Sequence, residues 1–279
     1  MGAFIVITTH GIFRRLLGRR RVDDINANLG APVIIGGTGG SGTRIFAQTC
    51  ISAGYFMGTN HNGALDALDY VDFYDRWVNA YLKRDETPLS NRNQRRMTHD
   101  FERRMRRHLV DIEPTQTRWG WKNPRSMLVL PFLAQQCSQM RFIHVVRDGR
   151  DMAYSGNQRQ PRLHGAQVYV DQMQELTESE QSIVSWCRTN LDVAAFGQDH
   201  LASRYLRVRF EDICDRPADT IGTILEFIEA PGVDPSDLVG QVKRPDSIGR
   251  WQGHPDDEVR HLHELGREAL EAFGYLNPT

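Results

Sequence analysis

The sequence predicts a three-layer α/β fold, in which helices flank a central and mostly parallel β-sheet. Two observations support this class. Short runs rich in β-branched and aromatic residues alternate with longer segments of helical periodicity, and this alternation is typical of parallel sheets. In addition, the first run is followed by a glycine-rich loop and then by a helical segment, an order in which the amino end of the helix can bind an anion.

Four segments are expected to be extended. Each is short, and each contains the β-branched or aromatic side chains that pack well on a pleated, buried surface. No internal repeat or low-complexity tract interrupts their alternation with helices. The four segments span residues 32–36 (PVIIG), 119–122, 141–146 (RFIHVV) and 205–210.

Helices are expected between these segments, where apolar residues recur three and four positions apart. Pro217 supports one of them, because proline suits the first turn of a helix. Residues 156–176 show no clear period, and residues 231–254, with several prolines and glycines, are expected to form a loop. The expected helices span residues 43–53, 66–82, 91–109, 126–137, 178–196, 217–228 and 256–273.

Composition places the chain among ordinary globular proteins. Its 279 residues suffice for a large core, and 40% hydrophobic with 25% charged residues argues against a disordered chain. A net charge of −1 excludes a chain-wide basic field, so no nucleic-acid partner is expected. We expect an N-terminal appendage at residues 1–30 and a single domain at residues 31–279. The sequence does not indicate an oligomeric state.

Cysteines and apolar runs bear on the location of the protein. The four cysteines are far apart and form no CxxC pair, which disfavours disulfide scaffolds and zinc knuckles and indicates a reducing, cytoplasmic compartment. No stretch approaches the length of a membrane span. Residues 12–21 are apolar and then basic, and we expect them to dock as a helix on the domain surface. Contact with an anionic membrane is the alternative.

A glycine loop at residues 36–44 (GGTGGSGTR) is the first candidate site. Small residues let backbone N–H groups approach a polyanion closely, so the loop is expected to bind phosphate; a tight turn without a ligand is the alternative. Gly37 and Gly42 have the spacing of a Walker A loop. However, Thr43 and Arg44 replace its Lys-Ser/Thr pair, which disfavours ATP hydrolysis.

A second anion site is expected after the strand at residues 141–146. Arg147 follows this strand directly, within the segment RDGRD, and Ser155 lies further along the chain. An arginine at the carboxyl end of a strand, with a hydroxyl one or two helical turns later, can clamp a phosphate. An arginine–aspartate turn that packs on itself is the alternative interpretation.

These motifs resemble those of the sulfotransferases that use 3'-phosphoadenosine 5'-phosphosulfate (PAPS). Residues 41–44 (SGTR) are similar to the family's 5'-phosphosulfate loop, which reads KGGTR in the glycosaminoglycan 3-O branch. Arg147 and Ser155 reproduce the arginine–serine spacing of its 3'-phosphate motif. Weaker similarities to the Golgi and bacterial members follow in order at residues 121–125 (WKNPR), 209–212 (RFED), 247–251 (SIGRW) and 273–275 (FGY).

The resemblance implies a P-loop-type fold, PAPS as the cofactor and adenosine 3',5'-bisphosphate (PAP) as its product. One position departs from the family, because Gly40 stands where a basic residue helps to neutralise the 5'-phosphosulfate. Arg44 and Lys122 are the available substitutes. An aromatic residue near the adenine and a late loop that covers the cofactor are also implied. The implied cofactor-binding residues are Gly39, Gly40, Ser41, Gly42, Thr43, Arg44, Arg147, Ser155, Phe210 and Arg250.

Sulfuryl transfer requires charge stabilisation at the leaving oxygen and a base for the acceptor, and no metal is expected. Lys122 is the candidate donor to the leaving oxygen, and a surface lysine is the alternative for this residue. Arg44 is a further catalytic candidate. The resemblance implies a base shortly after the loop, where His61 is the first candidate because imidazole titrates near neutrality. Asp66 is the second, with a helix N-cap as its alternative role.

The acceptor is expected to offer a hydroxyl or an amine, and a carbohydrate is one candidate. Residues 91–108 contain seven arginines, which form either a solvated helix face or a rim that grips an acidic glycan. Trp77, Trp119 and Trp121 either stack on sugars or pack in the core. Two other functions are weighed against PAPS-dependent sulfuryl transfer. They are a small-molecule P-loop kinase and a non-catalytic nucleotide-binding relative, to which Gly40 lends support.

Overall fold

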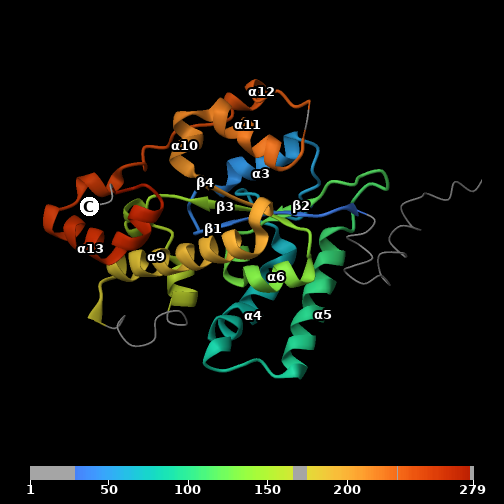
Figure 1. Cartoon of the computed structure of the whole chain (residues 1–279), viewed down its shortest axis with the longest axis horizontal. Coiled ribbons are helices and arrows are strands. Elements are labelled where there is room, and N and C mark those ends of the chain that lie inside the picture. Colours follow the sequence, from blue (N-terminus) through green and yellow to red (C-terminus); the bar gives the residue numbers. More distant parts are fainter. Residues whose placement is uncertain (1–28, 166–174, 231, 277–279) are drawn as a thin grey trace, which may run out of the picture.

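A four-stranded parallel sheet lies at the centre of the structure (Figure 1). The computed structural model describes residues 29–165, 175–230 and 232–276. The strand order is β2-β1-β3-β4, and each neighbouring pair is parallel, so all four carboxyl ends lie at one edge. The four predicted strands are confirmed as β1 (Val33–Gly37), β2 (Gly120–Lys122), β3 (Arg141–Val146) and β4 (Tyr205–Arg209).

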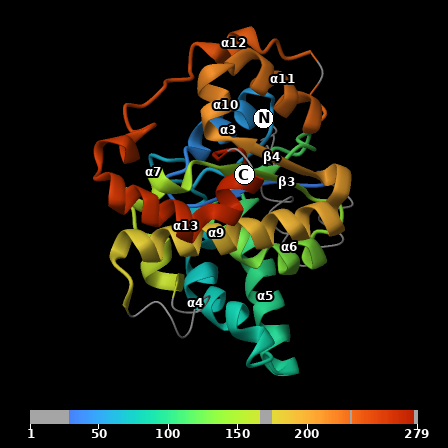
Figure 2. The ribbon, with the colours of Figure 1, turned by 60° about the vertical axis from the view of Figure 1, so that its left-hand side comes forward.

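Helices cover both faces of the sheet, which confirms the predicted three-layer α/β class (Figures 1 and 2). One layer consists of α3 (Thr43–Ser52), α10 (Phe210–Asp215), α11 (Pro217–Phe227) and α12 (Ser236–Val239).

The opposite layer contains α6 and α9, with α7 and α13 packed beside α9. A pair of helices, α4 and α5, extends from this layer away from the sheet (Figure 2). The bounds of these helices are α4 (Val71–Leu82), α5 (Asn91–His108), α6 (Leu130–Gln136), α7 (Gly149–Ala153), α9 (Glu178–Phe196) and α13 (Asp256–Ala272).

The core divides between the two faces of the sheet, because successive side chains of a strand point to opposite sides. Val33 and Ile35 of β1 pack with the apolar residues of α3 and α11. Ile34 packs on the other side, in a cluster with the aromatic residues of α4 and α5. Trp119 and Trp121 belong to this second cluster and are fully buried, so they serve the core and do not stack on a sugar.

Several elements differ in detail from the prediction. The segment 126–137 is divided into a 3₁₀ helix and α6, because Pro131 lacks the N–H that a continuous helix would need there. The helices α7, α10 and α12 were not predicted, since four to six residues are too few to show a helical period. Residues 231–254 were expected to form a loop, but they contain α12 and a short 3₁₀ helix. The 3₁₀ and π turns are η1 (Leu68–Tyr70), η2 (Lys83–Asp85), η3 (Pro124–Val129), η4 (Pro161–Gly165), η6 (Gly197–Leu201), η7 (Ala202–Arg204) and η8 (Arg250–Gly253).

Two predictions concern residues at the start of the chain. The appendage at residues 1–30, except for its last two residues, lies outside the described residues, and so does the helix expected at residues 12–21. Among the helices that the structure describes, none is both long and apolar enough to cross a membrane.

Candidate active site

The carboxyl edge of the sheet brings together motifs that are far apart in the sequence. The glycine loop follows β1, Lys122 ends β2, Arg147 follows β3 and Phe210 follows β4. The chain runs from β1 to its neighbour β2 and then crosses back past β1 to β3, so the order of the strands reverses direction beside β1. Open α/β sheets bind ligands outside the carboxyl ends of their strands at such a switch point. This edge is therefore the candidate active site.

The glycine loop has a backbone that only glycine adopts readily. Gly40 and Gly42 have φ angles of +97° and +80°, in the left-handed region. A side chain on Gly42 would also collide with the ring of Phe210. The helix α3 begins at Thr43, and Gly42 provides no side-chain cap, so the first N–H groups of α3 point towards the loop without a side-chain acceptor. These groups are suited to an anion.

Two buried polar atoms at this edge have no hydrogen-bond partner within the part of the chain that the structure describes. They are Oγ of Ser41, in a residue with 0% exposure, and Nε of Arg147, in a residue with 5% exposure. Buried polar groups normally have partners, and a ligand bound at this edge would provide one for each of these two atoms. A hydroxyl and a guanidinium beside a glycine loop fit a phosphate or sulfate group.

Arg147 links the glycine loop to a segment near the end of the chain. Its Nη1 donates to the backbone oxygen of Gly40 at 3.4 Å, and its Nη2 donates to the backbone oxygen of Ser247 at 2.6 Å. The guanidinium also lies 5.2 Å from the centre of the Phe210 ring. The ring of Phe210 is buried and lies close to both Gly42 and the Arg147 guanidinium.

Ser155 lies near the same loop residue as Arg147. A Cβ built on Gly40 would be 3.5 Å from Oγ of Ser155, and this oxygen accepts from the N–H of Asn157 at 3.2 Å. The structure therefore places Arg147 and Ser155 near the same loop residue, Gly40.

The late loop at residues 247–251 packs against α7 beside Arg147. Asp151 holds it, because one of its carboxylate oxygens accepts from the N–H of Gly249 at 2.9 Å. Arg250 is half-buried and donates through Nη1 to the backbone oxygen of Tyr154 at 3.2 Å. Burial lowers the pKa of Arg250, and the positive charge of Arg147 lowers it further. An anion placed between these two arginines would relieve their repulsion.

Lys122 lies at the end of β2 with only 2% exposure, which excludes a surface lysine. Its Nζ is 2.5 Å from Oδ1 of Asp66. Burial lowers the pKa of Lys122, the charge and hydrogen bond of Asp66 raise it, and the charge of Arg44 lowers it. Arg44 is exposed on the first turn of α3. The structure thus places Lys122 and Asp66 in direct contact, and a backbone bridge between His61 and Ala67 places His61 in the same loop.

The loop that carries Asp66 is tightly tied to β2. Asn62 donates through Nδ2 to Oδ2 of Asp66 at 2.9 Å, and the N–H of Ala67 donates to the backbone oxygen of Lys122 at 2.8 Å. Asp66 is not a helix N-cap, since Ala67 occupies that position before η1. His61 is held through Nε2 by the backbone oxygen of Gly58 at 2.8 Å, which leaves Nδ1 for any proton transfer.

Sequence reasoning missed two polar side chains that contact the glycine loop. Oε1 of Gln160 accepts from the N–H of Gly39 at 2.7 Å, and Nδ2 of Asn190 donates to Oγ1 of Thr38 at 3.3 Å. Gln160 belongs to a segment without a clear period, and Asn190 lies inside a helix, so neither position shows a motif. In the described ranges, no cluster of three or more His, Cys, Asp or Glu residues could hold a metal ion.

The fold and this edge of the sheet define an α/β protein with an anion-binding glycine loop. Residues 32–235, which are more than half of the chain, match the model of the sulfotransferase family. The chain therefore belongs to the sulfotransferase family.

Solved structures of sulfotransferases share the fold at low identity. The sulfotransferase domain of the Synechococcus PCC 7002 olefin synthase is 14% identical, with a TM-score of 0.52 over 90% of this chain and 97% of that domain. The sulfotransferase domain from the curacin biosynthetic pathway is 11% identical, with a TM-score of 0.50 over 89% of this chain and 99% of that domain. No curated protein matches the chain.

Proposed function

We propose that this protein transfers a sulfuryl group from PAPS to a hydroxyl or amine of an acceptor molecule. One observation carries the proposal: the glycine loop, Arg147 and Ser155 meet at one edge of the sheet, with buried polar atoms of Ser41 and Arg147 left without partners. Two anion-binding elements side by side suit a donor with phosphate groups at both its 3' and 5' positions. The family match favours this reaction over the kinase.

The residues divide between the two ends of the donor. Residues 39–44 would hold the 5' end through backbone N–H groups and Oγ of Ser41, while Arg147 and Ser155 would hold the 3'-phosphate. Arg250 would add a third positive charge from the late loop. When bound, PAPS supplies an activated sulfuryl group attached through an anhydride to phosphate. Gly40 contributes no charge, and Arg44 with Lys122 would replace the missing basic residue.

Lys122 and Asp66 would carry the chemistry. Nζ of Lys122 would donate to the oxygen that gains charge as the donor bond breaks, because preorganised donors stabilise developing charge. We propose Asp66 as the base, ahead of His61, because its carboxylate already lies beside Lys122. With an acceptor in hand, Asp66→Asn should lose turnover while His61→Gln keeps it. The reverse result would assign the base to His61.

The cofactor proposal is tested by thermal unfolding with PAP, and with ATP in the presence and absence of magnesium. A ligand that binds only the folded state raises the melting temperature by mass action. We expect stabilisation by PAP that needs no magnesium, little effect of ATP, and loss of the PAP effect in Arg147→Gln. The matched control is Arg216→Gln, which changes an exposed arginine directly after α10.

The other outcomes separate the alternatives. Stabilisation by ATP only with magnesium would replace the proposal with a kinase. Stabilisation by PAP without consumption of PAPS across an acceptor screen would identify a non-catalytic relative. No response to either nucleotide would overturn the cofactor site. We further propose that residues 31–279 form one sulfotransferase domain that acts in the cytoplasm, with a carbohydrate as its acceptor.

A further inference from the structure

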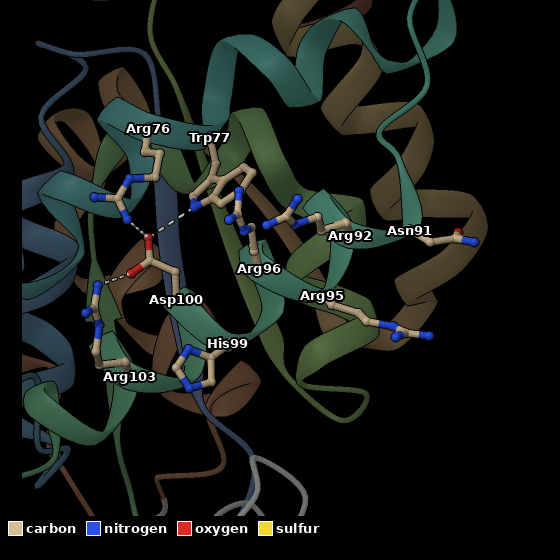
Figure 3. A pocket seen from close by; sticks show the side chains of 9 residues that line it. All are labelled: Arg76, Trp77, Asn91, Arg92, Arg95, Arg96, His99, Asp100 and Arg103. Carbon is tan, nitrogen blue, oxygen red and sulfur yellow. Dashed lines mark hydrogen bonds and ion pairs between the residues drawn. The ribbon is translucent and has the colours of Figure 1, made fainter.

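A groove lined by arginines lies between α4 and the amino-terminal half of α5, outside the candidate active site (Figure 3). It encloses about 750 Å³. We call it the arginine groove. Its basic lining residues are Arg76, Arg92, Arg95, Arg96, His99 and Arg103.

Asp100 is the acidic residue of this groove, and it already accepts hydrogen bonds from three neighbouring side chains. Asp100 accepts from Nη1 of Arg76 at 3.0 Å and from Nη2 of Arg103 at 2.7 Å, and the Trp77 indole donates to it at 3.0 Å (Figure 3). Burial raises the pKa of Asp100, but the hydrogen bonds and nearby arginines outweigh burial and lower it overall. The carboxylate therefore stays ionised and holds Arg76 and Arg103 in place.

Three further arginines in the groove have no such compensation. Arg92, Arg95 and Arg96 are exposed, and none of them forms an ion pair with any residue that the structure describes. The groove consequently has an excess of positive charge, although the whole chain has a net charge of −1. A local field of this kind attracts an anionic ligand to one place on the surface.

The basic residues also form a row along α5. Positions 92, 96, 99, 103 and 107 are separated by three or four residues, so they lie on one face of the helix. Fifteen residues of helix span about 22 Å, with neighbouring positions of the row about 6 Å apart. A row of this length is suited to a linear molecule with repeated negative charges, and it is much longer than a single phosphate.

The row ends at the loop that carries the candidate base. Nε of Arg107 lies 3.0 Å from Oδ1 of Asp69, and the same oxygen accepts from Nδ2 of Asn60 at 2.9 Å. Asn60 directly precedes His61, in the loop that places Asp66 beside Lys122. A molecule bound along α5 would therefore reach the candidate active site.

We propose that the arginine groove and the row along α5 bind an acceptor that is a polyanionic glycan, a carbohydrate chain with sulfate or carboxylate groups. The inference rests on the proposed function, because it brings the acceptor hydroxyl to the same Asp66. A molecule of this class offers a hydroxyl as the sulfuryl acceptor. It also carries repeated negative charges that the basic row along α5 can bind. A concave groove between two helices fits a chain better than it fits a flat bilayer.

The test measures binding of fluorescein-labelled dextran sulfate by fluorescence anisotropy, with uncharged dextran as the control ligand. The groove variant is R92Q/R95Q/R96Q, which leaves the candidate active site intact. The matched control is R216Q/R260Q/R267Q, which removes the same charge from the residue before α11 and from two positions of α13. We expect at least about a 10-fold loss of affinity in the groove variant, less than about a twofold change in the control, and a weaker salt dependence in the groove variant.

Two results would overturn the proposal. One is equal affinity of the groove and control variants for dextran sulfate. The other is groove-dependent binding to vesicles of phosphatidylserine and phosphatidylcholine that is tighter than binding to dextran sulfate, which would make the groove a membrane contact. Stabilisation by PAP is measured in the same variants and should be unchanged, which also shows that they fold. Absence of the PAP effect in the wild-type protein would overturn the cofactor proposal instead.

Discussion

The ammonium group of Lys122 is almost completely buried and is compensated by Asp66 at 2.5 Å. Removing one partner of a buried ion pair is costly, because the other charge stays buried without compensation. A donor anion at the glycine loop would offer Lys122 a second partner. Asp66 would then be freed in part from Lys122 at the moment when the acceptor needs a base. The ion pair therefore couples the proposed role of Lys122, as donor to the leaving oxygen, to the proposed role of Asp66 as the base.

The pKa of Lys122 gives a test at this residue. Because burial lowers this pKa, the side chain loses its proton at a lower pH than an ordinary lysine. Affinity for PAP should therefore fall as pH rises through the lowered pKa, by about 10- to 100-fold for the loss of one charge-assisted hydrogen bond. Isothermal titration calorimetry between pH 7 and pH 10 measures this profile.

Two variants complete this experiment. Lys122→Arg keeps a positive charge at high pH, so its affinity should stay constant across the range. Lys122→Ala should bind PAP weakly at every pH. A wild-type profile as flat as that of Lys122→Arg would contradict the assigned role of Lys122, provided that circular dichroism shows a folded protein at each pH.

Among the elements, short connections determine the site more than the long helices do. Arg150 shows this within RDGRD: it forms a bidentate ion pair with Asp148 and lies 3.9 Å from the centre of the Trp251 ring. The N–H of Asp148 in turn donates to Glu211, which also accepts from the hydroxyl of Tyr275. These contacts join α7 to the late loop, to α10 and to the end of the chain. They leave Arg147 as the arginine of this motif that faces the glycine loop.

Much of the fold follows from the sequence because strands and helices are local patterns. The strand β3 is apolar at four of its six positions, and α9 begins with a capping box at Thr177 and Glu180. The residues that we propose to bind the cofactor were also identified from local motifs, namely the glycine loop and the Arg147–Ser155 spacing. The contact of Gln160 with Gly39, in contrast, joins residues 121 positions apart, and no local pattern encodes it. The Lys122–Asp66 pair was missed for the same reason.

At the scale of the whole molecule, a buried polar chain crosses the interior between the sheet and α9. His144 of β3 contacts the hydroxyl of Tyr205 at 2.7 Å through Nδ1 and Oδ1 of Asn190 at 2.9 Å through Nε2. Asn190 also contacts Thr38 of the glycine loop. A fully paired buried network of this kind fixes one arrangement of the elements that it joins. It connects β3, β4 and α9 to the loop after β1.

The buried histidine of this polar network makes the stability of the protein dependent on pH. Burial lowers the pKa of His144 from 6.5 to about 4, so the folded state keeps the imidazole neutral while the unfolded state binds a proton. Between pH 6.5 and pH 4 the unfolded state binds more protons, and the free energy of unfolding must fall as pH falls. This one residue accounts for a loss on the order of 3 kcal/mol. His164, whose pKa burial also lowers to about 4, adds a second contribution of the same sign.

Urea unfolding at pH 7.0, 6.0 and 5.0 measures the effect of His144. His144→Gln removes the titrating group, so the variant should be less stable than wild type at pH 7 but should lose less stability on acidification. His99→Gln, which changes an exposed histidine on α5, should keep the wild-type pH dependence. If His144→Gln and wild type lose equal stability between pH 7 and pH 5, the buried imidazole does not cause the decrease in the free energy of unfolding at low pH. The remaining pH dependence would then belong to His164 and to the paired carboxylates.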